Sequence, residues 1–205
     1  MEIERTYTAF AGTRLIASAD LQTTVLRARD CLAGGETEAL LVFDDDTGKQ
    51  IDFDLRGTPE QVLERLASHP LVASMAPATR PGPGRPKLGV VSREVSLLPR
   101  HWDWLEQQSQ GASATLRRLV VDAIKHQPAG DRARMAREVA GRFMWSMAGN
   151  LPGFEEASRA LFAKDTERLE THTAGWPPDV RAHVTRLVRK ATEIEAAGAS
   201  DPTLP

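Results

Sequence analysis

A proline- and glycine-rich stretch near the middle of the chain limits the fold more than any other feature. Within residues 76–88 the breakers of regular structure crowd together at Pro81, Gly82, Pro83, Gly84 and Pro86. Proline has no backbone N–H and glycine leaves the backbone unrestrained, so neither a helix nor a strand is expected here. The sequence therefore predicts a linker at 76–89, with separately folded segments on either side.

The first segment, residues 1–75, predicts a small α/β domain with the order β-β-α-β-β-α. Strands are expected at 5–10, 14–17, 38–43 and 50–55, and helices at 20–32 and 58–68. Asp20 and Thr58 are suitable N-caps for the two helices. The side chains expected to face inward are Val25, Leu26, Cys31 or Leu32, Val62, Leu63 and Leu66.

An acidic cluster surrounds the predicted hairpin turn at Thr47 and Gly48. Its members are Asp44, Asp45, Asp46, Asp52 and Asp54. Grouped carboxylates suit hard cations, but this contiguous run lacks the spacing and the closing glutamate of an EF-hand loop. We therefore interpret the cluster as a solvated hairpin tip and predict no metal site.

The central segment, residues 90–127, predicts a strand followed by two helices. Apolar Val91, Val95 and Leu97 alternate with polar residues, which is typical of a strand at 91–98. Pro99 suits the first turn of a helix, and Gly111 breaks that helix. Ser113 is then a candidate N-cap for a second helix. One face of that helix is apolar, formed by Leu116, Leu119, Val120, Ala123 and Ile124.

This order resembles the ribbon-helix-helix DNA-binding fold, and the matching residues are 95–105 and 111–120. The resemblance implies an obligate homodimer whose paired strands enter the major groove. It also implies a phosphate held at the start of the second helix. The candidate dimer interface comprises Val95, Leu97, Trp102, Leu105, Leu116, Leu119 and Val120. The candidate DNA-binding residues are Arg80, Arg85, Lys87, Arg93, Ser96, Ser113, Ala114 and Thr115.

Two alternatives stay open for this segment. Glu94 lies at an outward strand position and would repel phosphate, which favours an assembly protein that uses the module only to dimerise. Gly84-Arg85-Pro86 is similar to the core of an AT-hook, whose arginine lies in a narrow minor groove. The other interpretation of that tripeptide is a plain spacer.

Several strings along the chain also resemble a bacterial protein family of unassigned function. They are Gly84–Gly89, Leu98–Trp102, Phe143-Met144 and Leu151–Glu155. This resemblance covers most of the chain and implies no particular biochemistry.

The last segment predicts a helical domain at 131–197 and a disordered tail at 198–205. Met135, Val139, Phe143 and Met147 recur at helical spacing and predict a packed face. Further helices are expected at 154–162, 165–172 and from about 179 onward. The flanking domains could hold a small molecule or a protein partner.

Charge and chemistry favour a binding protein over an enzyme. Residues 80–130 carry eight Lys/Arg and four Asp/Glu, whereas residues 1–79 carry seven and 13. Cys31 is the single cysteine, which fits a reducing compartment. The five histidines show no ligand spacing, although His172, Asp179 and His183 could converge. We therefore expect a cytoplasmic α+β homodimer that binds DNA, a possible transcriptional regulator, without catalytic residues, cofactors or membrane spans.

Overall fold

The computed structural model of the protein describes residues 5–75 and 93–199. The chain forms two compact units, a larger one from residues 1–72 and 129–205 and a central one from residues 73–128. The predicted borders at 75 and 131 lie close to those of the units. However, the two outer segments, predicted as separate domains, share one unit. The linker at 76–89 and residues 200–205 of the predicted tail lie outside the described residues, and α9 continues through Ala199.

A four-stranded antiparallel sheet forms the middle of the larger unit, with strand order β2-β1-β3-β4. The strands are β1 (Tyr7–Ala11), β2 (Arg14–Ala19), β3 (Leu40–Asp44) and β4 (Gln50–Ile51). The predicted β-β-α-β-β-α order is confirmed, with α1 (Leu21–Ala33) and α2 (Pro59–Ala67) as its helices. A short helix, α3 (Pro70–Met75), follows α2. The unit is of the α+β class, as predicted.

Local chemistry explains where these helices begin and where the last strand ends. The Asp20 carboxylate accepts from the Thr23 N–H, and Thr58 forms a capping box with Gln61. The strand predicted at 50–55 stops at Ile51. Beyond it, the carbonyl oxygen of Asp54 accepts from Arg65 of α2 and not from a neighbouring strand.

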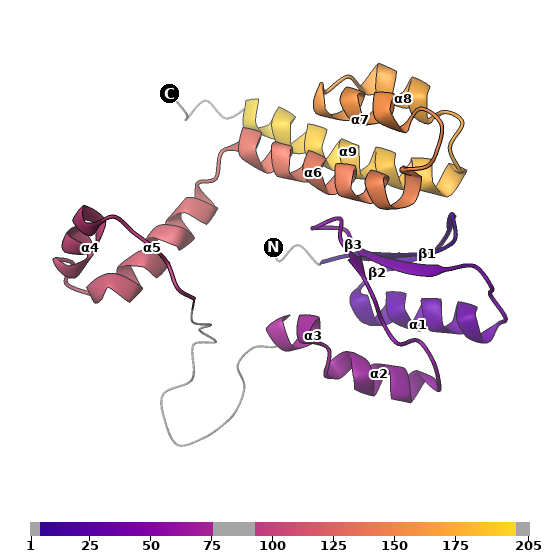
Figure 1. Cartoon of the computed structure of the whole chain (residues 1–205), viewed down its shortest axis with the longest axis horizontal. Coiled ribbons are helices and arrows are strands. Elements are labelled where there is room, and N and C mark those ends of the chain that lie inside the picture. The colour runs from indigo at the N-terminus through magenta and orange to yellow at the C-terminus, as the bar shows by residue number, and fades with distance from the viewer. Residues whose placement is uncertain (1–4, 76–92, 200–205) are drawn as a thin grey trace. The chain divides into compact units, whose positions relative to one another are not determined.

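Helices cover both faces of the sheet (Figure 1). Tyr7, Ala9 and Val42 pack against α1 and α2, while Phe10 and Phe43 face the C-terminal helices. Within α1 the buried apolar residues are Leu21, Val25 and Ala28. Of the predicted alternatives Cys31 and Leu32, Leu32 is wrong, since its side chain is 39% exposed, whereas Cys31 and Leu26 are half-buried. Leu32 lies on the same helical face as Leu21, Val25 and Ala28, but in the last turn of α1.

The C-terminal segment supplies α6 (Ala129–Ala148), α7 (Phe154–Phe162), α8 (Thr166–Thr173) and α9 (Pro178–Ala199). Helices α6 and α9 lie on the sheet, and α7 and α8 lie on their far side (Figure 1). Phe143 of α6 sits between Phe10 and Phe43, with ring centroids 5.6 and 5.0 Å away. Met135 was predicted in this face but is 49% exposed, because it precedes the part of α6 that packs on the sheet.

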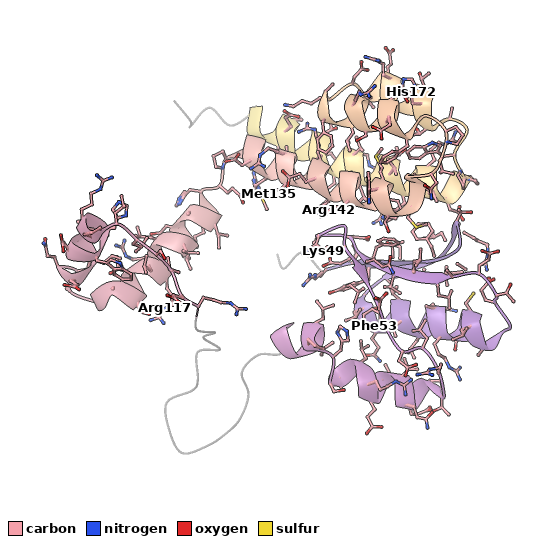
Figure 2. All side chains as sticks on the ribbon, in the orientation of Figure 1. Lys49, Phe53, Arg117, Met135, Arg142 and His172 are labelled. Atoms are coloured by element: carbon pink, nitrogen blue, oxygen red, sulfur yellow. The ribbon has the colours of Figure 1, made fainter. Side chains whose placement is uncertain are left out.

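The β3–β4 hairpin is also fastened to the helices. The Nε of Arg142 donates to the carbonyl oxygen of Thr47 at 2.6 Å, and Figure 2 shows Arg142 beside the sheet. The interpretation of the acidic cluster as a solvated tip holds for the exposed Asp46, Asp52 and Asp54 but is wrong for Asp44 and Asp45. Asp44 and Asp45 are buried, and Asp44, Asp45 and Asp46 form ion pairs with Arg5, Arg186 and Lys190, respectively. The turn of the hairpin therefore joins the sheet to α9.

Candidate functional site

Two helices of the central unit correspond to the two that the sequence predicts after the strand. They are α4 (Pro99–Glu106) and α5 (Gly111–Lys125). Pro99 occupies the first turn of α4, as expected for a residue without an N–H. Gly111 has a φ of +74°, which few other residues adopt, and it turns the chain into α5. Both helices and the break between them could therefore be predicted from the sequence.

The start of α5 differs from the prediction. Ser113 is not the N-cap, because the helix already begins at Gly111 with Gln110 before it. The side chain of Gln110 makes no capping hydrogen bond. Ser113 is exposed and its N–H belongs to the first turn, whereas the N–H groups of Ala114 and Thr115 fall within the helical i to i−4 pattern. The Gly111 N–H already donates to the carbonyl oxygen of Gln108 at 2.9 Å. A phosphate at this end would therefore meet the N–H groups of Ala112 and Ser113 rather than those of 113 to 115.

The strand predicted at 91–98 is not formed in the single chain. Residues 93–98 are neither helix nor strand, and residues 91 and 92 lie outside the described part. Leu98 is extended, with φ −67° and ψ 150°. Arg93, Val95 and Ser96 are exposed. A β-ladder requires a second strand, and none lies beside this segment among the described residues of the unit. The ribbon-helix-helix fold is thus not formed by one chain.

The apolar face of α5 is largely uncovered. The exposed fraction of the side chain is 41% at Leu119, 55% at Val120 and 67% at Ile124. Trp102 and Trp104 of α4 are also exposed, and Leu97 and Leu116 are half-buried. Among the described residues of this unit, only Leu105 and Thr115 are buried. The helix pair therefore has no core of its own, and the predicted interface residues, Leu105 excepted, line a free or half-covered surface.

The basic character of the segment lies mainly outside this helix pair. Residues 93–128 carry five Lys/Arg and four Asp/Glu, a net charge of +1. Arg80, Arg85 and Lys87, predicted to contact DNA, lie outside the described residues. The first turn of α5 contains no acidic side chain, so nothing in that turn repels an anion.

A buried polar network in the larger unit was not predicted from the sequence. His183 of α9 is 5% exposed, and its Nδ1 lies 2.9 Å from Nη2 of Arg186. The same Nη2 donates to Asp45 at 2.9 Å and to the hydroxyl of Thr8 at 3.0 Å. The Nε2 of His183 lies 3.5 Å from a carboxylate oxygen of Asp45. A signal existed, since His183 adjoins Val184 and lies one turn from Val180 on the buried face of α9.

The tautomer and charge of this histidine follow from its neighbours. Arginine can only donate, so Nδ1 of His183 is the acceptor and Nε2 carries the proton. Burial lowers the pKa of His183 to about 4, because Asp45 only partly offsets the effects of burial and of Arg186. The imidazole is therefore neutral at pH 7.

This network does not have the geometry of a catalytic triad. The hydroxyl of Thr8 donates to Asp45 and not to the imidazole, whose two nitrogens already face Arg186 and Asp45. The alternative in which His172 and Asp179 converge on His183 is also not found. Asp179 instead accepts from the Leu15 N–H at 2.8 Å. We interpret the network as a structural link between β1, the β3–β4 turn and α9.

The described residues contain no group of three or more His, Cys, Asp or Glu side chains placed to hold a metal ion. None of the described helices is both long enough and apolar enough to cross a membrane.

These observations define an α+β protein in which a helix-covered sheet is accompanied by a helix pair with an uncovered apolar face. The chain belongs to the family described as an uncharacterized protein conserved in bacteria, DUF2239, whose model matches residues 6–188. The match includes both units. No curated protein and no solved structure matches this chain.

Proposed function

We propose that residues 93–125 form a homodimerisation module through which the protein binds DNA. The observation that carries this proposal is the uncovered apolar face of α5, formed by Leu116, Leu119, Val120, Ala123 and Ile124. A helix of this length is only marginally stable without packing, so its apolar face requires a cover.

A second copy of the chain is the cover that fits best. Two copies bring two faces of the same composition together around a two-fold axis. They also bring residues 93–98 of one copy within reach of the same residues of the other. That segment already lacks helical structure, and antiparallel pairing would satisfy its backbone groups. Dimerisation would therefore both cover the apolar face of α5 and pair the backbone of residues 93–98, as in the ribbon-helix-helix arrangement.

The DNA-binding part of the proposal rests on the positions of the polar residues. Arg93 and Ser96 are exposed on the segment that would become the ribbon. Ser113 is exposed in the first turn of α5, where helix N–H groups attract anions. The net charge of +4 over residues 80–130 would be doubled in a dimer, which raises the attraction for phosphates.

A single substitution on α5 tests the dimer. Val120→Glu is expected to leave the isolated chain folded, since Val120 is exposed there, and to weaken the dimer about 100-fold or more by placing an unpaired charge in the interface. Sedimentation equilibrium of the full chain measures this. Lys125→Glu, on the opposite side of α5, is the control and should remain dimeric. A parent protein that stays monomeric at high micromolar concentration contradicts the proposal.

A substitution in the first turn of α5 tests DNA binding. Ser113→Glu places a carboxylate where it favours the helix dipole by roughly 0.3–1 kcal/mol but repels a phosphate. We expect an unchanged dimer and melting temperature, together with a loss of DNA affinity of about tenfold or more. Fluorescence anisotropy with a random-sequence duplex at two salt concentrations measures the affinity. Ser113→Gln, similar in size but neutral, should bind nearly as well as the parent.

A second candidate function is a dimeric assembly protein that does not bind nucleic acid. The modest net charge of +1 over residues 93–128 and the exposed Glu94 favour it. The two candidates give different results in the same experiment. An assembly protein is a dimer sensitive to Val120→Glu, yet it shows no salt-dependent binding of DNA in the parent.

A further inference from the structure

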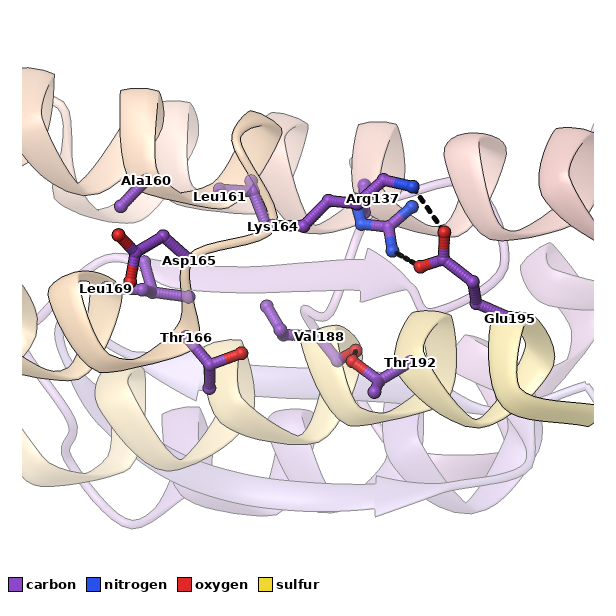
Figure 3. Close-up of a pocket in the computed structure, with 10 residues that line it drawn as sticks. All are labelled: Arg137, Ala160, Leu161, Lys164, Asp165, Thr166, Leu169, Val188, Thr192 and Glu195. Atoms are coloured by element: carbon purple, nitrogen blue, oxygen red, sulfur yellow. Dashed lines mark hydrogen bonds and ion pairs between the residues drawn. The ribbon is translucent and has the colours of Figure 1, made fainter. Parts of the chain in front are cut away.

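Three helical segments of the larger unit meet at a charged contact (Figure 3). Arg137 of α6 is a buried cation, only 7% exposed. Its guanidinium and the ammonium of Lys164, which follows α7, each donate to a different carboxylate oxygen of Glu195 on α9. These bonds, the one from Lys164 first, lower the pKa of Glu195, so its carboxylate is ionised at neutral pH. One carboxylate therefore lies between two cations.

An apolar groove leads away from this contact. A pocket of about 80 Å³ lies beside Arg137 and Lys164. A larger groove of about 270 Å³ runs between α8 and α9. The two share four lining residues, Thr166, Leu169, Val188 and Thr192, so they adjoin each other. Figure 3 shows these side chains along the floor and sides, with the two cations at one end. Apolar walls with a few convergent polar groups are typical of small-molecule sites.

The backbone at Lys164 adds a second, independent observation. Lys164 has a φ of +62° and is the only non-glycine residue with positive φ among the described residues. It closes α7 in a Schellman motif, in which the Lys164 N–H donates to Leu161 and the Asp165 N–H donates to Ala160. Glycine is the residue that this position favours. A lysine here carries backbone strain and in exchange supplies the second cation, and strain of this kind clusters at ligand sites.

We propose that this groove binds a small aliphatic monocarboxylate. The ligand carboxylate takes the place of the Glu195 carboxylate between Arg137 and Lys164, and its carbon chain lies along Leu169 and Val188. The Glu195 carboxylate shows how the ligand carboxylate would bind, since each of its two oxygens accepts from one of the two cations. Glu195 lies near the end of α9, where a helix opens locally at little cost, so the carboxylate can leave.

The charges around the groove select the class of ligand. A ligand with one carboxylate replaces one internal charge by another. A dicarboxylate would place its second charge where Asp165, Glu170 and Arg189 line the groove. Two carboxylates there face one guanidinium, which already pairs with Glu193. An ammonium head would face Arg137 and Lys164. The inference concerns the larger unit and does not depend on dimerisation or on DNA binding.

Titration of the full chain with hexanoate tests the proposal. Glu195→Gln removes the competing carboxylate, and we expect it to bind hexanoate about tenfold more tightly than the parent, because the parent site is open for a small fraction of the time. Glu156→Gln is the matched control. Glu156 is an exposed α7 residue that pairs with Arg159, and neither residue lines this groove, so affinity should not change. Calorimetry measures both, with hexylamine as the ligand that should not bind.

A second variant keeps the test decisive if Glu195→Gln does not fold. Lys164→Gly suits the positive φ, so the fold should be kept, and we expect the affinity of the otherwise native chain for hexanoate to fall about tenfold. Hexanoate should also shift the methyl resonances of Leu169 and Val188. The proposal is overturned if folded Glu195→Gln shows no binding at millimolar hexanoate. It is also overturned if Lys164→Gly binds as the parent does, or if acetate binds as tightly as hexanoate.

Discussion

Replacing Gly48 with alanine is expected to destabilise the larger unit by about 3 kcal/mol. Gly48 has a φ of +67°, which costs a non-glycine residue roughly 1–2 kcal/mol. A Cβ on Gly48 would also lie 2.3 Å from the carbonyl oxygen of Val139 in α6, closer than any real contact. Because that atom belongs to the helix backbone, it cannot move aside as a flexible side chain would. Overpacking of this kind typically costs a further 1–3 kcal/mol.

The neighbouring contacts prevent the turn from relaxing. The carbonyl oxygen of Thr47 accepts from Arg142 of α6, and the Gly48 N–H donates to the carbonyl oxygen of Asp44 at 2.7 Å. Moving the turn away from α6 would break the first of these bonds. We therefore expect the midpoint of thermal unfolding, followed by circular dichroism, to fall by about 6–12 °C.

Gly35→Ala provides the control for the backbone strain alone. Gly35 also has a positive φ, of +91°, but nothing lies within 4 Å of the position of its Cβ. We expect it to lose only the conformational part, roughly 1–2 kcal/mol. Equal losses in the two variants would mean that the close approach of the hairpin to α6 contributes nothing to the stability.

Much of the secondary structure was predictable from the sequence because its causes are local. Asp20 and Thr58 cap helices through atoms three residues away, and Pro99 and Gly111 act through their own backbone. Errors arose where a partner distant in the sequence decides the outcome. The ladder ends at Ile51, and three residues later the carbonyl oxygen of Asp54 accepts from Arg65 of α2 instead of from a strand. The alternation at 91–98 predicts a strand, but a single chain offers that segment no ladder.

The shared core could not be predicted for the same reason. Phe10 and Phe43 pack on Phe143, which follows them by 100 residues or more, and the proline-rich stretch between suggested separate domains. The acidic run looked solvated because Arg186 and Lys190 lie about 140 residues away in sequence. Besides the position of His183, the sequence holds a second signal of a buried ion pair. Arg137 falls on the small, apolar stripe of Ala133, Ala140 and Met144, and a charge on a buried stripe requires a specific partner.

The helix pair α4 and α5 shows which features a sequence pattern can predict and which it cannot. Its helices were predictable, and so was the composition of the α5 face, but exposure of that face in the single chain is information that only the structure provides. The N–H groups of the first turn lie two residues earlier in the chain than predicted. The reason is that α5 begins at Gly111, which has a positive φ, whereas Ser113 was predicted as the N-cap. Ser113→Glu is therefore a sharper probe than a change at Ala114.

The buried histidine gives the largest expected effect of pH on stability. The pKa of His183 is about 4 in the folded chain, against an ordinary value of 6.5, because burial disfavours the imidazolium. Between these two values the unfolded chain binds the proton and the folded chain does not. The stabilisation is therefore complete above about pH 6.5 and is lost as the pH falls toward 4. A difference of this size corresponds to about 3 kcal/mol.

Comparison with His183→Gln isolates this contribution from that of the carboxylates, which titrate in both proteins. We expect the free energy of unfolding of the parent, measured in urea, to approach that of the variant by about 1.4 kcal/mol per pH unit from pH 6.5 to 4. His172→Gln, at a half-buried position outside the network, should run parallel to the parent. A constant difference between the parent and His183→Gln over this range would mean that the imidazole is already charged beside Asp45. In that case Arg186 could not lie as close to Nδ1 as it does, because both groups would then be donors facing each other.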